Sequence, residues 1–428
     1  MKNEQQSSMY KWVLLGFLWV AYFLQQGTRQ IYNAILPNIQ ADFGVDSIKM
    51  GLVATLFTVM YGLCVPFSGV LGDVISRKRI VVVGVLVFST GIFFSGTVAT
   101  IGMMILTYGI INAVGQSFYY PPSSSLLGQA HNQTRSTALS ILQTAQYAGI
   151  VICSCVAGYL ADLKTVQMPE LLSGIMGEQV AGWRLPFYIF GAIGIVWAFC
   201  LAFFMKDAKQ QATADGEQKA TFFEAFKVVF SRPSALLLAI VFGFLVYIDV
   251  GFKTWMPTYM AETFFSGNLT SANFNVVIWV YCGAFVGVMI GSRICDKLFA
   301  KIKSIRFSLN LFGFFMIAPF LFMSANTDTL SMCKASLLLY GIFKGICDSC
   351  IFASVLDVVP ARYRASGMGL MICGGFIIGS TSSTILGFIR EAFSLTAGIS
   401  SLSIFCVINV VVLFIIIRCF FKRDYVES

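Results

Sequence analysis

Long apolar runs separated by short polar segments follow one another along the whole chain. A helix that crosses a membrane needs about 20 apolar residues at about 1.5 Å per residue. By this measure the first half of the chain contains candidate spans near residues 12–37, 48–71, 80–98, 101–123, 135–161 and 184–205. The second half contains candidate spans near 234–262, 272–295, 306–324, 332–358, 365–389 and 395–418. The pattern therefore predicts an all-α membrane protein with twelve transmembrane helices.

The longest hydrophilic stretch, residues 206–232, lies between the two sets of spans. We therefore predict an N-terminal six-helix bundle over residues 1–205 and a C-terminal six-helix bundle over residues 233–428. The stretch between them is predicted to be a cytoplasmic central loop with a short amphipathic piece at Phe222–Phe230. Because the N-terminal residues are polar and no small-residue cleavage site follows, we expect the first apolar run to be a permanent span.

The two halves carry matched features in the same order. Tyr108-Gly109-Ile110 in span 4 returns as Tyr340-Gly341-Ile342 in span 10. Spans 1 and 7 end in Ile35-Leu36-Pro37 and Trp255-Met256-Pro257. Repeated six-span halves are typical of secondary transporters, which hold their substrate near the middle of the membrane. The repeat predicts two pseudo-symmetric bundles.

Composition and charge support a membrane protein and indicate its orientation. The chain is 57% hydrophobic and 11% charged, whereas a soluble domain is about 25% charged. The net charge of +9 comes mainly from lysines and arginines in the loops of one side, while the opposite loops are poor in them. This predicts cytoplasmic termini in a cell inner membrane rather than nucleic-acid binding. The twelve cysteines are scattered singly, and His131 is the single histidine. We expect no metal site and no cofactor.

The loop after span 2 carries a glycine, an aspartate and a basic cluster within residues 69–79, read as Gly-Val-Leu-Gly-Asp-Val-Ile-Ser-Arg-Lys-Arg. With this motif and the repeated halves, the chain resembles the major facilitator superfamily. Ser76 stands where that family usually has a glycine. The resemblance implies a cytoplasmic gate at Asp73, Arg77 and Asp296, whose charge contacts form and break as the two halves rock.

Within that superfamily the chain is most similar to the organophosphate:phosphate antiporters and the anion:cation symporters. Arg29, eight residues before Pro37, lies where the antiporters have a substrate-binding arginine. Their second arginine, in span 7, is replaced here by Asp249, which disfavours a phosphate ester. The symporters carry sugar acids such as hexuronates and sialic acid with a proton, and often have an acidic residue where this chain has Gln116.

Five ionisable residues fall inside the predicted spans: Arg29, Asp249, Lys253, Lys344 and Asp348. Asp249 and Lys253 are four residues apart, as are Lys344 and Asp348, so each couple shares one helix face. The five charges sum to +1, which a monocarboxylate would neutralise better than a phosphate ester near −2. Protonation of either aspartate would raise the sum and favour anion binding, so both are candidates for proton coupling. Alternatively, each couple is an ion pair that only holds helices together.

Arg29 is the candidate for the substrate carboxylate. An ionisable group at the centre of a span costs about 2.5 to more than 10 kcal/mol, and no acidic residue lies three or four positions away along the helix. Arginine stays charged and offers a bidentate fork to a carboxylate.

Amides and phenols accompany these charges at a density that is costly in a membrane unless they face a wet cavity. The predicted substrate contacts are Arg29, Gln26, Tyr32, Asn33, Asn112, Gln116, Tyr119, Gln143, Tyr147, Lys253 and Lys344. Such a set suits a sugar acid better than an apolar drug, although tyrosines and glutamines also join helices by hydrogen bonds.

We therefore expect a secondary active transporter that imports an organic anion, a sugar acid of the sialic acid or hexuronate type, by proton symport. The alternatives are sugar-phosphate/phosphate antiport and drug or metabolite efflux by proton antiport. The expected partners are a small organic anion, protons or sodium ions, and the lipid bilayer. We expect a monomer that is not an enzyme, because the sequence contains no nucleophile–base set.

Overall fold

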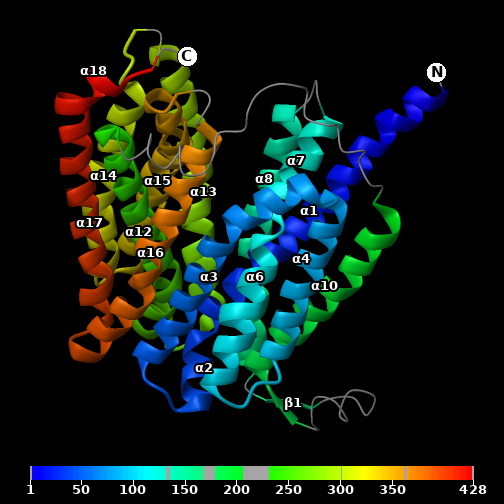
Figure 1. Ribbon diagram of the computed structural model, residues 1–428. Helices are drawn as coiled ribbons and strands as arrows, with labels where there is room; N and C mark the ends of the chain where they lie inside the picture. The colour runs from blue at the N-terminus through cyan, green and yellow to red at the C-terminus, as the bar shows by residue number, and fades with distance from the viewer. Residues whose placement is uncertain are drawn as a thin grey trace. The chain divides into compact units, whose positions relative to one another are not determined.

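The computed structural model describes residues 2–131, 135–163, 165–167, 179–205, 231–299, 301–360 and 364–426 (Figure 1). The amphipathic piece expected at 222–230 lies outside these residues. The chain divides into two compact units. Unit 1 comprises Met1–Thr213 and Met260–Phe274, and unit 2 comprises Ala214–Tyr259 and Asn275–Ser428. The segment Met260–Phe274 thus groups with unit 1, although the sequence assigned it to the second bundle.

Unit 1 is a helical bundle with a small two-stranded sheet at one end (Figure 1). Its helices are α1 (Lys2–Ala34), α2 (Leu36–Phe43), α3 (Ser47–Val74), α4 (Arg77–Ser95), α5 (Ile101–Met104), the π-helix η1 (Ile105–Asn112), α6 (Ala113–Ser117), α7 (Tyr120–Ala130), α8 (Arg135–Asp162), the 3₁₀ turn η2 (Gly182–Arg184) and α10 (Leu185–Phe204). The strands β1 (Thr165–Gln167) and β2 (Gln179–Ala181) pair antiparallel.

Unit 2 is built from long helices. They are α12 (Pro233–Phe264) and α13 (Leu269–Phe299), which also carry the segment that groups with unit 1, then α14 (Ile305–Ala325), α15 (Leu330–Val358), α16 (Arg364–Ala392), α17 (Leu395–Ile415), the π-helix η4 (Ile416–Phe420) and α18 (Phe421–Asp424).

Every predicted span falls on a helix or on a run of consecutive helices. Within the described residues, eleven helices are long and apolar enough to cross a membrane. The helix α1, which carries the first predicted span, is not among them. Its second half contains several polar residues, with Arg29 between glutamines, which lowers its mean hydropathy.

Span 1 ends through local turn chemistry. The helix α1 stops at Ala34, and α2 begins one residue later with Pro37 in its first turn, where proline's missing N–H costs no hydrogen bond. Gly44 follows α2 with φ 58°, a left-handed conformation that glycine adopts without steric cost. Asp46 then caps α3, accepting a hydrogen bond from the Lys49 N–H at 2.7 Å.

Span 4 is one candidate membrane span over Ile101–Leu127, which includes the predicted 101–123, but its helical geometry changes along its length. It passes from α5 into the π-helix η1, then into α6, and α7 starts with Pro121 and Pro122 in its first turn. Proline cannot donate to the preceding turn, which accounts for the break before α7. π-helical turns are rare in proteins, and those that occur are often found at functional sites. This one carries Tyr108 and Asn112.

Close helix packing repeats in equivalent places of the two halves. The helix α1 packs against α8, α4 against α10, and α14 against α17. A Cβ atom on Gly149 of α8 would lie 2.4 Å from the carbonyl oxygen of Phe23 on α1. A Cβ atom on Gly379 of α16 would lie 2.4 Å from Cγ1 of Val246 on α12. Spans 1 and 5, and likewise spans 7 and 11, therefore approach each other at a glycine.

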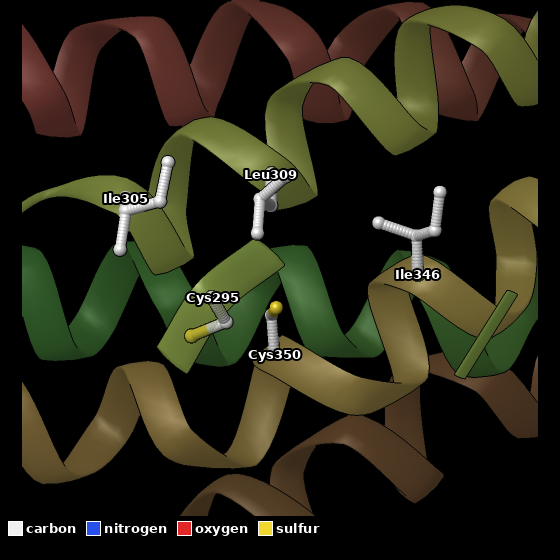
Figure 2. Close-up of a cluster of buried hydrophobic side chains, with 5 residues drawn as sticks. All are labelled: Cys295, Ile305, Leu309, Ile346 and Cys350. Atoms are coloured by element: carbon white, nitrogen blue, oxygen red, sulfur yellow. The ribbon is translucent and has the colours of Figure 1, made fainter. Parts of the chain in front are cut away.

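An apolar cluster fixes the rotation of α15 about its axis. Figure 2 shows its members, Cys295, Ile305, Leu309, Ile346 and Cys350, which come from α13, α14 and α15. At about 100° per residue, Ile346 and Cys350 lie on the opposite side of α15 from the residues two positions before them. Those residues are Lys344 and Asp348, which are thereby kept away from the apolar cluster.

Candidate functional site

Arg29 lies on α1 within unit 1 and is half-buried. Its guanidinium carbon is 5.0 Å from the ring centroid of Phe57 and 4.9 Å from that of Tyr61. Both rings belong to α3 and are one helical turn apart. A cation over an aromatic face gains about 0.5 to 2 kcal/mol, more where water is excluded. We call these two rings the aromatic cradle of Arg29.

The backbone of Arg29 is also held. The hydroxyl of Tyr108, on the π-helix η1, donates to the carbonyl oxygen of Arg29 at 2.7 Å. The Tyr108 ring lies 5.3 Å from the ring of Phe57, so Tyr108 also packs on the cradle. Phe57, Tyr61 and Tyr108 are not among the site residues predicted from the sequence. The four-residue spacing of Phe57 and Tyr61 on span 2 was the available signal.

Gln26 and Asn33 lie three residues before and four residues after Arg29, on the same face of α1. Both are half-buried. The Gln26 amide nitrogen lies 3.4 Å from the Gln25 side-chain oxygen, and the Asn33 amide donates to the Gln30 oxygen at 2.9 Å. Of the predicted contacts on α1, these two amides are the ones that share the Arg29 face and keep some exposure.

Asn112 and Gln116 form a fully buried node between span 1 and span 4. Gln25 donates to the Gln116 carbonyl oxygen at 2.7 Å, and the Gln116 amide donates to Oδ1 of Asn112 at 3.0 Å. Nδ2 of Asn112 and Oε1 of Gln116 have no hydrogen-bond partner among the described residues. One donor and one acceptor so placed suit a hydroxyl group or a water molecule.

Tyr32 and Tyr119 are fully buried, and each donates its hydroxyl to a backbone carbonyl. Tyr32 donates to Met50 at 2.7 Å and Tyr119 donates to Leu18. These bonds join helices within unit 1. Substrate contact by either tyrosine stays a prediction, and we leave both out of the contacts proposed below because their hydroxyls are already engaged.

Gln143 and Tyr147 lie on α8 and are half-buried. The Gln143 amide donates to the Gln146 side-chain oxygen at 2.6 Å, and the same oxygen accepts from the Tyr22 hydroxyl at 3.0 Å. Gln143 therefore belongs to a hydrogen-bonded group that links α8 to α1. Its contact with substrate, like that of Tyr147, stays a prediction.

In unit 2 the four intramembrane charges form one chain. Lys253 lies 2.7 Å from Oδ2 of Asp249, and Lys344 lies 2.6 Å from Oδ2 of Asp348, as the four-residue spacings predicted. The sequence did not predict the link between the couples, in which Lys344 also lies 3.5 Å from Oδ1 of Asp249. The order Lys253–Asp249–Lys344–Asp348 alternates in sign and sums to zero.

The residues proposed for the gate are only partly described. Arg77 is the first residue of α4 and is half-buried, while the side chains of Asp73 and Asp296 lie outside the described residues. The gate therefore stays a prediction. An ion pair that the sequence analysis missed lies in unit 2, where Arg306 at the start of α14 contacts the buried carboxylate of Asp357 near the end of α15.

Long apolar helices in two repeated sets, with charged side chains inside the spans, define a polytopic membrane protein of the transporter type. The family model described as "Major Facilitator Superfamily" matches residues 18–383. The chain belongs to this superfamily, and the predictions of the family and of an all-α, twelve-helix membrane fold are confirmed. Membership also makes it a transporter rather than an enzyme.

The chain is also similar to individual transport proteins and to a solved transporter structure. A cis,cis-muconate transport protein of Acinetobacter baylyi is 22% identical over 92% of this chain and 92% of its own length. A probable sulfoacetate transporter of Cupriavidus necator is 20% identical over 89% of this chain and 87% of its own length. The crystal structure of a bacterial homologue of the human lysosomal transporter Spinster, inward-facing and unoccupied, matches 98% of this chain and 99% of its own with a TM-score of 0.84 at 19% identity. This last similarity establishes the fold alone.

Proposed function

We propose that this protein is a secondary active transporter that imports an organic anion, a sugar acid of the hexuronate or sialic acid type, by proton symport with alternating access. The observation that carries the proposal is Arg29, a guanidinium held on two aromatic rings within a membrane-spanning bundle. A cation maintained at that cost is suited to binding an anion. We place the protein in the cell inner membrane with both termini in the cytoplasm, because its basic residues gather in the loops of that side.

The charge balance favours a monocarboxylate. The four charges of unit 2 neutralise one another in a bonded chain, so the excess of +1 among the intramembrane charges resides on Arg29. One carboxylate matches that excess, whereas a phosphate ester near −2 would leave negative charge in a region of low dielectric. The names of the two relatives from Acinetobacter and Cupriavidus denote organic acid anions, which supports an organic anion as substrate. They do not bear on its single charge, because muconate and sulfoacetate each have two acidic groups.

The groups beside Arg29 favour a polyhydroxylated acid. Gln26 and Asn33 present amides on the same face of α1, and amides both donate to and accept from hydroxyl groups. Lys253 and Lys344 are further candidate contacts. An apolar drug would offer no partner to the donor and acceptor positions that these amides do not already use, at a cost of about 1–3 kcal/mol each, so the efflux alternative fits less well.

Transport by reconstituted protein distinguishes the alternatives. Proteoliposomes with an alkaline interior are given labelled D-glucuronate or N-acetylneuraminate, and uptake is compared with and without a protonophore. Symport predicts accumulation that the protonophore abolishes. Exchange of glucose 6-phosphate for internal phosphate, without accumulation of either acid, would contradict the proposal in favour of the antiporter. Extrusion of an apolar cation dye without acid uptake would contradict it in favour of efflux.

A further inference from the structure

We propose that Asp348 is the carboxylate that takes up the coupled proton, while Asp249 stays ionised. Protonation of Asp348 releases Lys344 to bind the transported anion. This inference rests on the proposed function, proton symport of a sugar acid, and adds the residue and the order of events.

The two aspartates differ in how many lysines hold their charge. Each oxygen of Asp249 faces an ammonium group, with Lys253 at 2.7 Å and Lys344 at 3.5 Å. Among the described ion pairs Asp348 has one ammonium neighbour, Lys344 at 2.6 Å, and shares it with Asp249. Neutralising Asp249 would disrupt two ion pairs, whereas neutralising Asp348 disrupts one, and Lys344 then still has Asp249 as a neighbour. Asp348 is therefore the less costly site for a proton.

The exposure of the side chains favours the same residue. The side chain of Asp348 is 36% exposed, against 24% for Asp249 and 14% for Lys344. Asp348 is thus the most exposed of the four side chains, ahead of Lys253 at 26%, and Lys344 is the least exposed. The apolar cluster of Figure 2 packs the opposite side of α15 through Ile346 and Cys350, so that Asp348 does not withdraw into the core.

The other titratable groups near Lys344 and Asp348 can be named for the described residues. The titratable groups around the Lys344–Asp348 pair are Asp249 and Lys253 of α12, Tyr281 of α13, and Tyr340 and Cys347 of α15. The described charged residues of α14 and α16 lie at helix ends: Arg306, which contacts Asp357, Arg390, which lies over the Trp255 ring, and Glu391.

The charge balance couples the proton to the anion. Before a proton binds, the charges of the two lysines and two carboxylates in this ion-paired series sum to zero. When one proton joins the Asp348 carboxylate, the sum becomes +1 and Lys344 loses its closest counter-ion. The charge of the bound anion then offsets the charge that the proton added. Loss of the proton regenerates the Asp348 carboxylate, which competes with the anion for Lys344 and promotes its release. Proton and anion thus each raise the affinity for the other.

The test is calorimetric binding of D-glucuronate and N-acetylneuraminate to purified wild type, Asp348→Asn and Asp249→Asn, in buffers of different ionisation enthalpy. Asp249→Asn is the matched control because it makes the same change at the other neighbour of Lys344. In wild type we expect uptake of one proton per anion and binding that tightens about tenfold for each unit fall in pH. We expect Asp348→Asn to bind with no proton uptake and no pH slope, and Asp249→Asn to keep the slope whatever its affinity.

Each outcome decides. A full slope in Asp348→Asn overturns this inference, and a slope lost in Asp249→Asn alone assigns the proton to Asp249 instead. If wild type binds an acid without pH dependence, or binds neither acid, the proposed function itself fails. If Asp348→Asn does not fold, infrared difference spectra of wild type and Asp348→Glu on addition of the bound acid replace it. A protonated-carboxyl band that appears in wild type and shifts in Asp348→Glu supports the inference, and its absence or an unshifted band overturns it.

Discussion

The ammonium group of Lys344 on α15 lies 3.5 Å from Oδ1 of Asp249 on α12, and this contact joins two intrahelical ion pairs into one chain. Lys344 is therefore the lysine with two carboxylate neighbours, whereas Lys253 has one among the described ion pairs. The two lysines should differ in their importance for stability.

We expect Lys344→Met to lower the free energy of unfolding by about 2 kcal/mol, because it leaves Asp348 without its lysine in a partly buried site. Lys253→Met should cost less, since Asp249 keeps Lys344. Thermal unfolding of the detergent-solubilised variants measures both. Adding Asp348→Asn to Lys344→Met should recover part of the loss. Equal destabilisation by the two lysine variants would show that the contact between α12 and α15 contributes nothing.

The aromatic cradle should tune the affinity for the anion. Tyr61→Leu removes a ring 4.9 Å from the Arg29 guanidinium and should weaken binding by about 2- to 30-fold, the equivalent of about 0.5–2 kcal/mol. Tyr61→Phe keeps the ring and should bind like wild type. The ring of Phe93 packs on Tyr188, also in unit 1. Phe93→Leu is therefore the control for loss of an aromatic side chain away from Arg29. Calorimetry measures the affinity of each variant for glucuronate. An affinity of Tyr61→Leu equal to that of wild type would contradict a role of the aromatic cradle in binding.

The π-helix of span 4 should matter through Tyr108. Tyr108→Phe loses the hydrogen bond to the Arg29 carbonyl oxygen, and Tyr32→Phe loses one to the Met50 carbonyl oxygen, both 2.7 Å long. Each substitution should lower stability by about 1 kcal/mol. Only Tyr108→Phe should also weaken glucuronate binding, because it loosens the backbone that carries Arg29. Equal affinities of the two variants for glucuronate would show that the Tyr108 hydrogen bond from η1 does not contribute to substrate binding.

Asp162, at the end of α8, caps the first turn of α13. Its carboxylate accepts from the backbone N–H of Leu269 at 3.2 Å and from the N–H and hydroxyl of Thr270 at 3.0 and 2.7 Å. Losing a cap costs about 1 kcal/mol, so Asp162→Ala should speed amide hydrogen exchange at the start of α13 by about fivefold. Asp46→Ala removes the equivalent cap of α3 and should leave α13 unchanged. Unaltered exchange in Asp162→Ala would rule out this contact as a stabiliser of the segment.

The features that could be predicted from the sequence are those that lie within a single helix. Apolar length located the spans, Pro37 predicted the end of span 1, and four-residue spacing predicted the Asp249–Lys253 and Lys344–Asp348 pairs. Contacts between helices depend on packing that the spacing does not contain. The Lys344–Asp249 link and the Arg29 cradle were therefore missed.

Residue type alone does not distinguish a substrate contact from a hydrogen bond that joins two helices. Tyr32 and Tyr119 carry hydroxyls suited to a sugar, yet both are fully buried and donate to backbone carbonyls. The π-helix of span 4 was likewise invisible in the sequence, because a π-helical run such as residues 105–112 has the same apolar composition as an α-helix.

Glucuronate binding to Arg29→Lys tests whether Arg29 binds the carboxylate of the transported acid. Lysine keeps the charge but loses the bidentate fork and the stacking of a planar group on Phe57 and Tyr61. Arg184→Lys is the matched control, because Arg184 also lies over an aromatic ring, Trp183 at 4.5 Å, but pairs with Asp42 at the end of a bundle helix. We predict affinity at least about tenfold weaker in Arg29→Lys and unchanged in Arg184→Lys. Unchanged affinity in Arg29→Lys would contradict the account.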